Sequence, residues 1–342
     1  MDLRDQNFGI EIEFTGITRK MAARVVAKYF DTSPRHIGGT YDTYTIKDER
    51  GRIWKIVSDA SLTAEMKSGY PRTRVAASQD YKVEFVSPIC QYEDISKVQQ
   101  VVRNFRSAGA FVNDRCGIHV HVDASNHDAR SLRNIVNIMA SKEDLFYKAL
   151  DIKYDRQHYC KKADKRFLEK INRMKPQTRE QLSYLWYGNH RYHSHYDSTR
   201  YHALNLHSVF TKGTVEFRMF NSTMHAGKIK TYIQFCLAIS AQAINQKKAS
   251  PVKTRTTNEK YTFRTWLLRL GMKGKEFETA RKFLLENLEG CIAWKDPAQA
   301  EAQKERLRAI RESQSCETVD SEIEQCEENT QEIQAEEPLL HM

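Results

Sequence analysis

The sequence predicts an α+β fold, in which helices cover one face of a sheet and the other face is polar. Two patterns lead to this expectation. Short segments alternate apolar and polar residues with a period of two, which is typical of strands that bury one face. Longer segments between them repeat apolar residues near i, i+3, i+4 and i+7, as helices do when they pack against a core. With 342 residues, 40% of them hydrophobic, the chain is long enough to bury one substantial core.

The strand pattern is clearest in four segments: Phe8–Phe14, Tyr81–Val86, Gly117–Asp123 and Thr214–Met219. A fifth strand is expected at Ile53–Val57. In the four segments, the residues opposite the apolar face are mostly charged or able to bind a metal. They are Glu11, Glu13, Glu84, His119, His121, Asp123, Glu216 and Arg218.

Helices are predicted at roughly 18–30, 93–108, 127–150, 161–173, 225–246 and 274–288. The stretch 188–199, rich in Tyr, His and Ser, is expected to be a loop. We expect residues 1–297 to form one domain. Residues 298–342 are expected to be helical at first and then acidic and disordered.

The net charge of +10 conceals an asymmetry along the chain. Residues 312–342 contain ten Asp and Glu and no Lys or Arg, which leaves residues 1–311 at +20. Such a basic body could bind nucleic acid, or it could attract an anionic nucleotide and an acidic substrate. No segment is apolar for the roughly 20 residues that a membrane helix needs, so a cytoplasmic protein without membrane contact is expected.

The seven cysteines are scattered and never spaced as C-x-x-C, which favours reduced thiols over a disulfide framework or a structural zinc site. Cys116 precedes the two histidines of the third strand and could be a nucleophile. The alternative, a small residue at a strand edge, is the better interpretation.

If the four strands pair, their carboxylates converge, and such crowding is tolerated chiefly where divalent cations and an arginine neutralise it. Carboxylate oxygens with one imidazole suit Mg²⁺ or Mn²⁺, and Mg²⁺ commonly brings nucleotide phosphates as further ligands. ATP is therefore expected. No P-loop or Rossmann fingerprint occurs, so a nucleotide would have to be held on the sheet by metals and arginines. The alternative is an antiparallel sheet whose exposed face is simply polar.

The order of four motifs resembles the amidoligase family of carboxylate–amine ligases, which has a glutamine-synthetase-like fold and stands alongside glutamate–cysteine ligases. The motifs are Phe8–Phe14, Val83–Pro88, Cys116–Asp123 and Thr214–Phe220, and Arg200–Leu206 also fits the pattern. Together they span roughly residues 7 to 245. The resemblance implies a curved, mostly antiparallel sheet with helices on one face and the active site on the other, and it makes residues 1–297 the catalytic domain.

The resemblance also implies roles for individual residues. Glu11 and Glu13 would bind two metals. Glu84 would join the site of Glu13, whereas His119 and Glu216 would join that of Glu11.

Three further residues would contact the nucleotide or the reacting groups. His121 would face nucleotide or phosphate. Arg218 and Arg200 would hold the transferring phosphate or the substrate carboxylate, as both catalytic and nucleotide-binding residues. Asp59 is a candidate for binding the amine.

The activity implied is ATP-dependent joining of a small-molecule or peptide carboxylate to an amine through an acyl-phosphate, with release of ADP. Two alternatives stay open. One is a metal-dependent hydrolase that uses His119 and His121. The other is a basic nucleic-acid-binding protein, which the acidic sheet face disfavours. A homo-oligomer is also left open.

Overall fold

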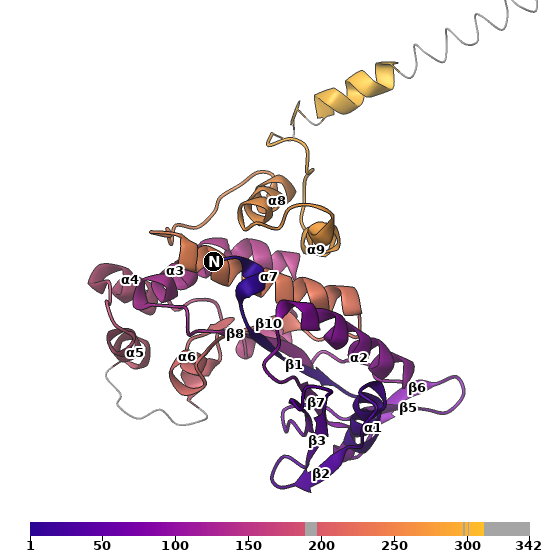
Figure 1. Cartoon of the computed structure of the whole chain (residues 1–342). Helices are drawn as coiled ribbons and strands as arrows, with labels where there is room; N and C mark the ends of the chain where they lie inside the picture. The colour runs from indigo at the N-terminus through magenta and orange to yellow at the C-terminus, as the bar shows by residue number, and fades with distance from the viewer. Residues whose placement is uncertain (189–196, 297, 300, 311–342) are drawn as a thin grey trace, which may run out of the picture. The chain divides into compact units, whose positions relative to one another are not determined.

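An eight-stranded antiparallel sheet forms the centre of the chain in the computed structural model, which describes residues 1–188, 197–296, 298–299 and 301–310 (Figure 1). Each neighbouring pair of strands is antiparallel. The α+β prediction is confirmed, while its finer form, a glutamine-synthetase-like fold, stays a prediction. In spatial order the strands are β2 (Arg35–Gly38), β3 (Thr43–Lys47), β4 (Ile53–Val57), β7 (Val83–Val86), β1 (Phe8–Phe14), β8 (Gly117–Asp123), β10 (Thr214–Asn221) and β9 (Leu204–Asn205).

The four segments with the clearest alternation are the four central strands, β7, β1, β8 and β10. Their alternate apolar residues are almost fully buried, as in β1, where Ile12 and Phe14 have no exposed surface. The predicted strand at Tyr81–Val86 began two residues too early, because Gln79–Tyr81 forms a 3₁₀ turn. A separate two-stranded hairpin, β5 (Glu65–Ser68) and β6 (Thr73–Ala76), lies outside the large sheet.

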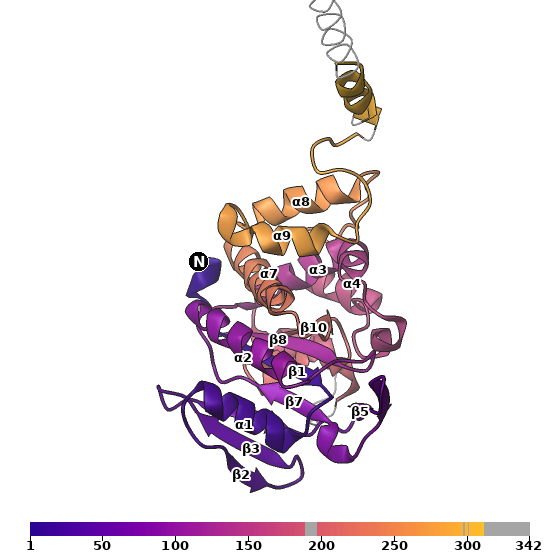
Figure 2. The ribbon, with the colours of Figure 1, turned by 90° about the vertical axis from the view of Figure 1, so that its right-hand side faces the viewer.

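All six predicted helices are present. They are α1 (Arg19–Tyr29), α2 (Ile95–Ser107), α3 (Ala129–Ala149), α4 (Lys165–Met174), α7 (Ala226–Asn245) and α9 (Glu278–Leu285). Side-chain N-caps begin several of them, for example Thr18 before α1 and Asp128 before α3. Helices α1 and α7 contact the sheet, and α2 packs between them on the same apolar face (Figure 2). The opposite face of the central strands is therefore left for the charged side chains.

Three short helices were not predicted: α5 (Arg179–Tyr187), α6 (His207–Thr211) and α8 (Glu259–Arg269). The chain divides into two compact units, Met1–Arg255 with Phe263–Leu288, and Thr256–Thr262 with Glu289–Met342. The domain boundary expected at 297 stays a prediction. Residues 301–310 are helical, whereas the predicted acidic tail and most of the loop at 188–199 lie outside the described residues. Within the described part, no helix is long and apolar enough to span a membrane.

Candidate active site

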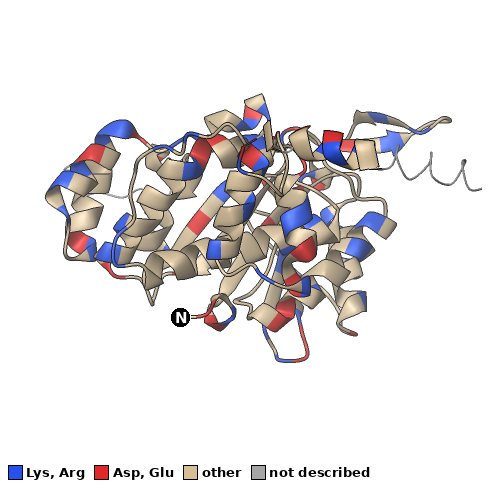
Figure 3. Cartoon of the chain, turned by 90° about the horizontal axis from the view of Figure 1, so that it is seen from above, with Lys and Arg blue, Asp and Glu red and all other residues tan. Residues whose placement is uncertain are grey.

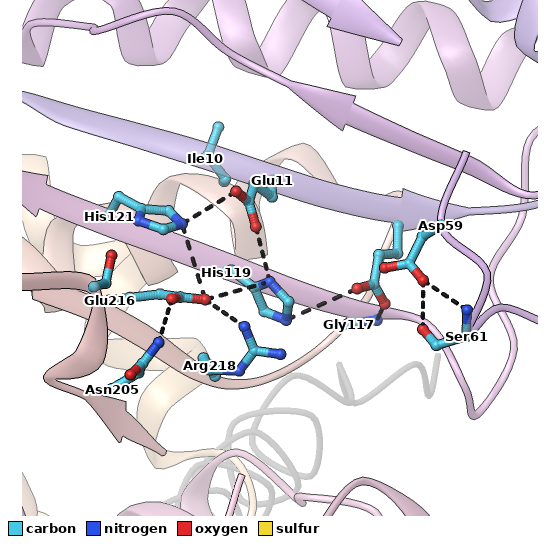
Figure 4. Close-up of polar contacts among 12 residues, drawn as sticks. Ile10, Glu11, Asp59, Ser61, Gly117, His119, His121, Asn205, Glu216 and Arg218 are labelled. Carbon is cyan, nitrogen blue, oxygen red and sulfur yellow. Dashed lines mark hydrogen bonds and ion pairs between the residues drawn. The ribbon is translucent and has the colours of Figure 1, made fainter. Parts of the chain in front are cut away.

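The register of the central strands brings the predicted site residues together on the polar face. Glu13 of β1 lies opposite Glu84 of β7, and Glu11 lies opposite His119 of β8. On the other side of β8, His121 lies opposite Glu216 of β10. Because side chains two residues apart share a face, these pairs form one continuous polar row across four strands. Figure 4 shows the part of the row formed by Glu11, His119, His121 and Glu216.

Two groups within this row have the composition of a divalent cation site. In each group, one ligand atom per residue lies within 4.8 Å of the others: Glu11, His119 and Glu216 in one, and Glu13, Glu84 and His119 in the other. His119 belongs to both groups, with Nδ1 3.0 Å from Glu11 Oε2 and Nε2 3.8 Å from Glu13 Oε1. The family resemblance implied that His119 would join only Glu11 and Glu216, whereas the structure also brings it near Glu13 and Glu84. Carboxylates with a single imidazole are suitable ligands for Mg²⁺ or Mn²⁺.

Crowding of acidic groups disturbs the pKa values at the Glu13 end of the row. Burial raises the pKa of Glu13 to about 7, although the Arg156 guanidinium acts in the opposite direction. Burial and the negative charges of Glu11, Glu13 and Asp59 raise the pKa of Glu84 well above its ordinary value. Such carboxyl groups become stable as anions when a cation binds between them. The shifts therefore fit a metal site.

At the other end of the row, charges are better balanced. Burial lowers the pKa of His119 to about 4, and the positive charge of Arg218 acts in the same direction, so the imidazole is neutral at pH 7 and able to bind a metal. Burial disfavours a charged Glu216, but Arg218 and His121 outweigh it and lower the pKa of Glu216 to about 2. Burial likewise disfavours a charged His121, but the carboxylates of Glu11 and Glu216 raise its pKa.

Arg218 and His121 both lie beside Glu216. Arg218 Nη1 donates to Glu216 Oε1 at 2.5 Å, and its buried Nε has no hydrogen-bond partner among the described residues. His121 Nδ1 contacts Thr214 Oγ1 at 2.9 Å. Its buried Nε2 lies 3.3 Å from Glu11 Oε1 without forming a hydrogen bond. Buried polar atoms without partners mark places where a ligand can bind.

Several supporting residues were not found from the sequence. Asn205 of β9 donates to Glu216 Oε2 at 2.6 Å, and the Gly117 amide donates to Glu13 Oε2 at 2.5 Å. Lys212 Nζ lies 3.6 Å from Glu11 Oε1. The asparagine had a detectable signal, since it falls inside the Arg200–Leu206 motif, but nothing in the local pattern distinguished Gly117 or Lys212.

A cleft of about 650 Å³ opens over the Glu13 end of the row. Its wall includes Arg200, the second arginine expected to bind an anion, which also lines a small adjoining pocket together with Asn205 and Glu216. Asp59, the candidate for the amine, lines the same cleft and accepts hydrogen bonds from the amide and hydroxyl of Ser61. Basic residues at the cleft are Arg115, Arg156, Arg200, Lys212 and Arg218.

A second, mostly apolar hollow of about 320 Å³ adjoins the opposite end of the row. It shares Glu11, His121 and Lys212 with the polar face. Its lining also includes Val86, Pro88 and Ile89, and the segments of Phe8 and Ile10, whose side chains belong to the core. The row of potential metal ligands thus has an apolar hollow at one end and, at the other, a cleft lined by both basic and acidic residues.

Cys116 does not have the properties of a nucleophile. It is 1% exposed, and burial raises the pKa of its thiol to about 12, so the thiolate is scarce at neutral pH. The interpretation of Cys116 as a small residue at the start of a strand is favoured.

The crowded carboxyls predict how pH and metal affect stability. A glutamate with a pKa near 7 when folded and near 4.3 when unfolded binds more protons in the folded state, so the free energy of unfolding falls as pH rises between these values. Because Mg²⁺ binds the deprotonated carboxylates, we expect 10 mM Mg²⁺ to raise the melting temperature more at pH 8 than at pH 6. Thermal unfolding with Mg²⁺ or with chelator measures this. Equal increases in melting temperature at pH 6 and pH 8 would contradict this expectation. In Glu84→Gln, the increase caused by Mg²⁺ should depend less on pH.

One comparison with known proteins, a family model, agrees with the residue pattern. A family model described as "Putative amidoligase enzyme" matches residues 4–240. No curated protein matches the chain. Among solved structures, the chain is similar to a bifunctional glutathione synthetase from Pasteurella multocida, with 14% sequence identity and a TM-score of 0.36. The similarity covers 91% of this chain and 49% of that chain, so the chain spans about half the length of the glutathione synthetase.

Proposed function

Because this chain belongs to the amidoligase family, we propose that it is an ATP-dependent ligase that joins a carboxylate to an amine through an acyl-phosphate. The observation that carries the proposal is the pair of potential metal sites near His119, set between an apolar hollow and a cleft that contains five basic residues. An enzyme that transfers phosphate from ATP to a carboxylate needs such an arrangement, since both reactants are anions.

The chemistry assigns a task to each group of residues. A carboxylate is a poor acyl donor, because its charge repels nucleophiles and its oxygen leaves badly. In the first step a carboxylate oxygen forms a bond to the γ-phosphorus while the bond from that phosphorus to ADP breaks. In the second, an amine nitrogen attacks the carbonyl carbon, inorganic phosphate leaves, and the amine loses a proton.

The two groups that share His119 would hold the cations. Glu11, His119 and Glu216 would hold one, and Glu13 and Glu84 the other, because a neutral imidazole has one free nitrogen and binds only one cation. Bound Mg²⁺ or Mn²⁺ would neutralise the phosphate oxygens of ATP and the developing negative charge. His121 and Arg218 would donate to phosphate oxygens from the Glu216 side. Asp59 lines the cleft where the amine and the acid would bind, and Arg200 lines both this cleft and the small pocket beside Glu216.

The apolar hollow suits the base and ribose of ATP. Its volume of about 320 Å³ falls within the range of small-molecule sites. Gly9 lies two residues before Glu11 on the polar face of β1 and lines the hollow. A Cβ atom at Gly9 would meet nothing closer than His121 Cβ at 3.8 Å, so a larger side chain can be accommodated by the backbone but would fill the hollow.

Gly9→Val is therefore expected to weaken Mg·ATP binding by about 10-fold or more, since overpacking a formed site costs about 1–3 kcal/mol. Binding of Mg·tripolyphosphate, which lacks a nucleoside, should change by less than about threefold. Calorimetric titration of both ligands measures the difference, with Gly9→Ala as the graded control. If Gly9→Val weakened both ligands equally, the base would not lie in this hollow.

The direct test of the proposed function is an ADP-release screen. Purified protein with Mg²⁺ and ATP is supplied with pairs of carboxylates and amines, including peptides, and ADP is measured against reactions that omit one partner. ADP release that requires both partners supports a ligase. Absence of ADP release with every pair, from a protein that hydrolyses esters or amides without ATP, would support the metal-dependent hydrolase instead.

The nucleic-acid-binding alternative finds less support in the distribution of charge. Basic and acidic residues are interspersed along the helices seen in Figure 3. Some of the basic residues are paired locally, as Lys162 is with Asp144 and Lys228 with Glu286. A sequence-independent nucleic-acid interface would be expected to concentrate positive charge on one surface.

A further inference from the structure

A buried arginine, Arg156, lies at the cleft without a matching anion. Arg156 is 4% exposed and lines the cleft beside Glu13. Its Nη2 donates to the Arg218 carbonyl at 3.2 Å, and its Nε has no hydrogen-bond partner among the described residues. Its one ion-pair contact in the described part of the chain is Glu13 Oε2, 3.9 Å from Nη1, which is too long for a hydrogen bond. Because buried guanidinium groups are normally paired by carboxylates, Arg156 retains donors for an anion that enters the cleft.

A glycine makes room for this guanidinium. Gly117 lies two residues before His119 on the same face of β8. A Cβ atom at Gly117 would lie 2.2 Å from both Nη atoms of Arg156 and 2.4 Å from Cζ. The guanidinium therefore occupies the space that a side chain at position 117 would fill, and it extends the polar row formed by His119 and His121.

The segment that carries Arg156 is tied to the sheet. Arg156 belongs to a 3₁₀ helix, Tyr154–His158, and the Lys153 amide just before this helix donates to Asn221 Oδ1 at the end of β10. The Arg156 carbonyl accepts from the amides of Tyr159 and Cys160. These contacts hold the arginine at a fixed place relative to Glu13, as an anion-binding residue requires.

The order of groups along the strands indicates which anion it meets. With a rise of about 3.3 Å per residue, Gly117 and His121 are about 13 Å apart on β8. The apolar hollow adjoins His121, whereas Arg156 lies over Gly117, so the two are at opposite ends of the row with His119 between them. A nucleotide whose base lies in the hollow would reach His119 with its terminal phosphate. The acid must then approach from the Arg156 end.

Building on the proposed ligase function, we propose that Arg156 binds the carboxylate of the acid substrate. The planar guanidinium would hold one carboxylate oxygen and leave the other directed at the γ-phosphorus. The directed oxygen forms the new bond to phosphorus, the bond between that phosphorus and ADP breaks, and ADP carries away the electron pair. Arg156 itself neither gains nor loses a proton.

The test uses hydroxylamine as a general amine, because it converts an acyl-phosphate into a hydroxamate that gives a coloured iron complex. The full chain is assayed with Mg·ATP, hydroxylamine and a panel of amino acids, dicarboxylates and short peptides. For each acid that the wild type accepts, Arg156→Gln should raise the KM of the acid by about 10- to 100-fold, the effect of losing a charged hydrogen-bond partner. The KM of Arg156→Lys should lie between those of the wild type and Arg156→Gln, because lysine keeps the positive charge but lacks the planar guanidinium. Arg166→Gln removes an exposed positive charge that does not line the cleft and should change KM by less than about threefold.

Measurements of nucleotide binding distinguish an Arg156 that binds the acid's carboxylate from one that binds the γ-phosphate of ATP. Calorimetry should give Arg156→Gln the wild-type affinities for Mg·ATP and Mg·ADP within about threefold. A selective loss of ATP affinity would assign Arg156 to the γ-phosphate and overturn the proposal. So would an unchanged KM in both Arg156 variants, or a wild type that binds Mg·ATP but forms hydroxamate from no acid in the panel. A wild type that binds no Mg·ATP would instead contradict the proposed ligase function itself.

Discussion

Replacing His119 with alanine is expected to abolish cation-dependent ATP binding and to lower ligase turnover by about 1000-fold or more. The reason is its position, because His119 is the one residue that belongs to both potential metal groups. Removing even a residue that only orients a metal ligand typically costs about 10- to 100-fold in metal affinity or activity. The neutral imidazole binds one cation, but His119 also faces the second group, so its loss should reach or exceed the upper end of that range.

Glutamate variants that affect one group each provide the matched comparison. Glu216→Gln removes a ligand only from the group with Glu11, and Glu84→Gln only from the group with Glu13. We expect Glu216→Gln to weaken Mg·ATP binding strongly. Glu84→Gln should affect turnover more than nucleotide binding, since Glu84 lines the cleft.

Calorimetric titration of Mg·ATP, repeated with chelator, measures these effects. His158→Ala is the control, because this histidine is exposed and lies outside both groups. Melting temperatures in chelator show whether each variant is folded. A folded His119→Ala protein that binds Mg·ATP with wild-type affinity would remove His119 from the metal site.

The central strands could be predicted because one side of each strand packs against helices and the other lines the polar face of the sheet. In β1 and β8 the apolar residues pack under helices and the alternate residues line the polar face, so both faces leave a signal in the sequence. The short outer strands leave no such signal. All four residues of β6 are exposed, and β2 has no buried residue, so neither strand shows alternation.

The grouping of the carboxylates could be expected only through the family resemblance, because alternation gives the face of a residue but not the register of its strand. The structure supplies the register, with Glu11 opposite His119 and Glu13 opposite Glu84. Their roles as metal ligands remain a prediction. Arg156 could not be found from the sequence at all, since it reaches the site from a 3₁₀ helix and is recognised only by its contact with Gly117.

Arg218→Lys is expected to keep Mg·ATP affinity within about threefold and to lower turnover by about 100-fold. The sequence places Arg218 two residues after Glu216 on one face of β10, and the structure pairs the two side chains directly, with Nη1 2.5 Å from Glu216 Oε1. When Glu216 binds a cation, the guanidinium has donors available for the phosphoryl group, including the buried Nε that has no partner among the described residues. A lysine can balance the charge of Glu216, but it cannot reproduce a planar fork around moving phosphate oxygens.

The size of the effect distinguishes a catalytic Arg218 from a structural counter-ion. Loss of one preorganised donor to a transition-state oxygen typically costs about 100- to 1000-fold in kcat. A counter-ion to Glu216 needs only a positive charge, which lysine supplies. The decisive comparison is single-turnover formation of ADP by wild type and Arg218→Lys, with an acid and an amine identified in the screen and with saturating Mg·ATP. Arg166→Lys, at an exposed position that does not line the cleft, is the matched control and should react at the wild-type rate. If Arg218→Lys also reacted within about threefold of wild type, the ion pair with Glu216 would be the whole role of Arg218.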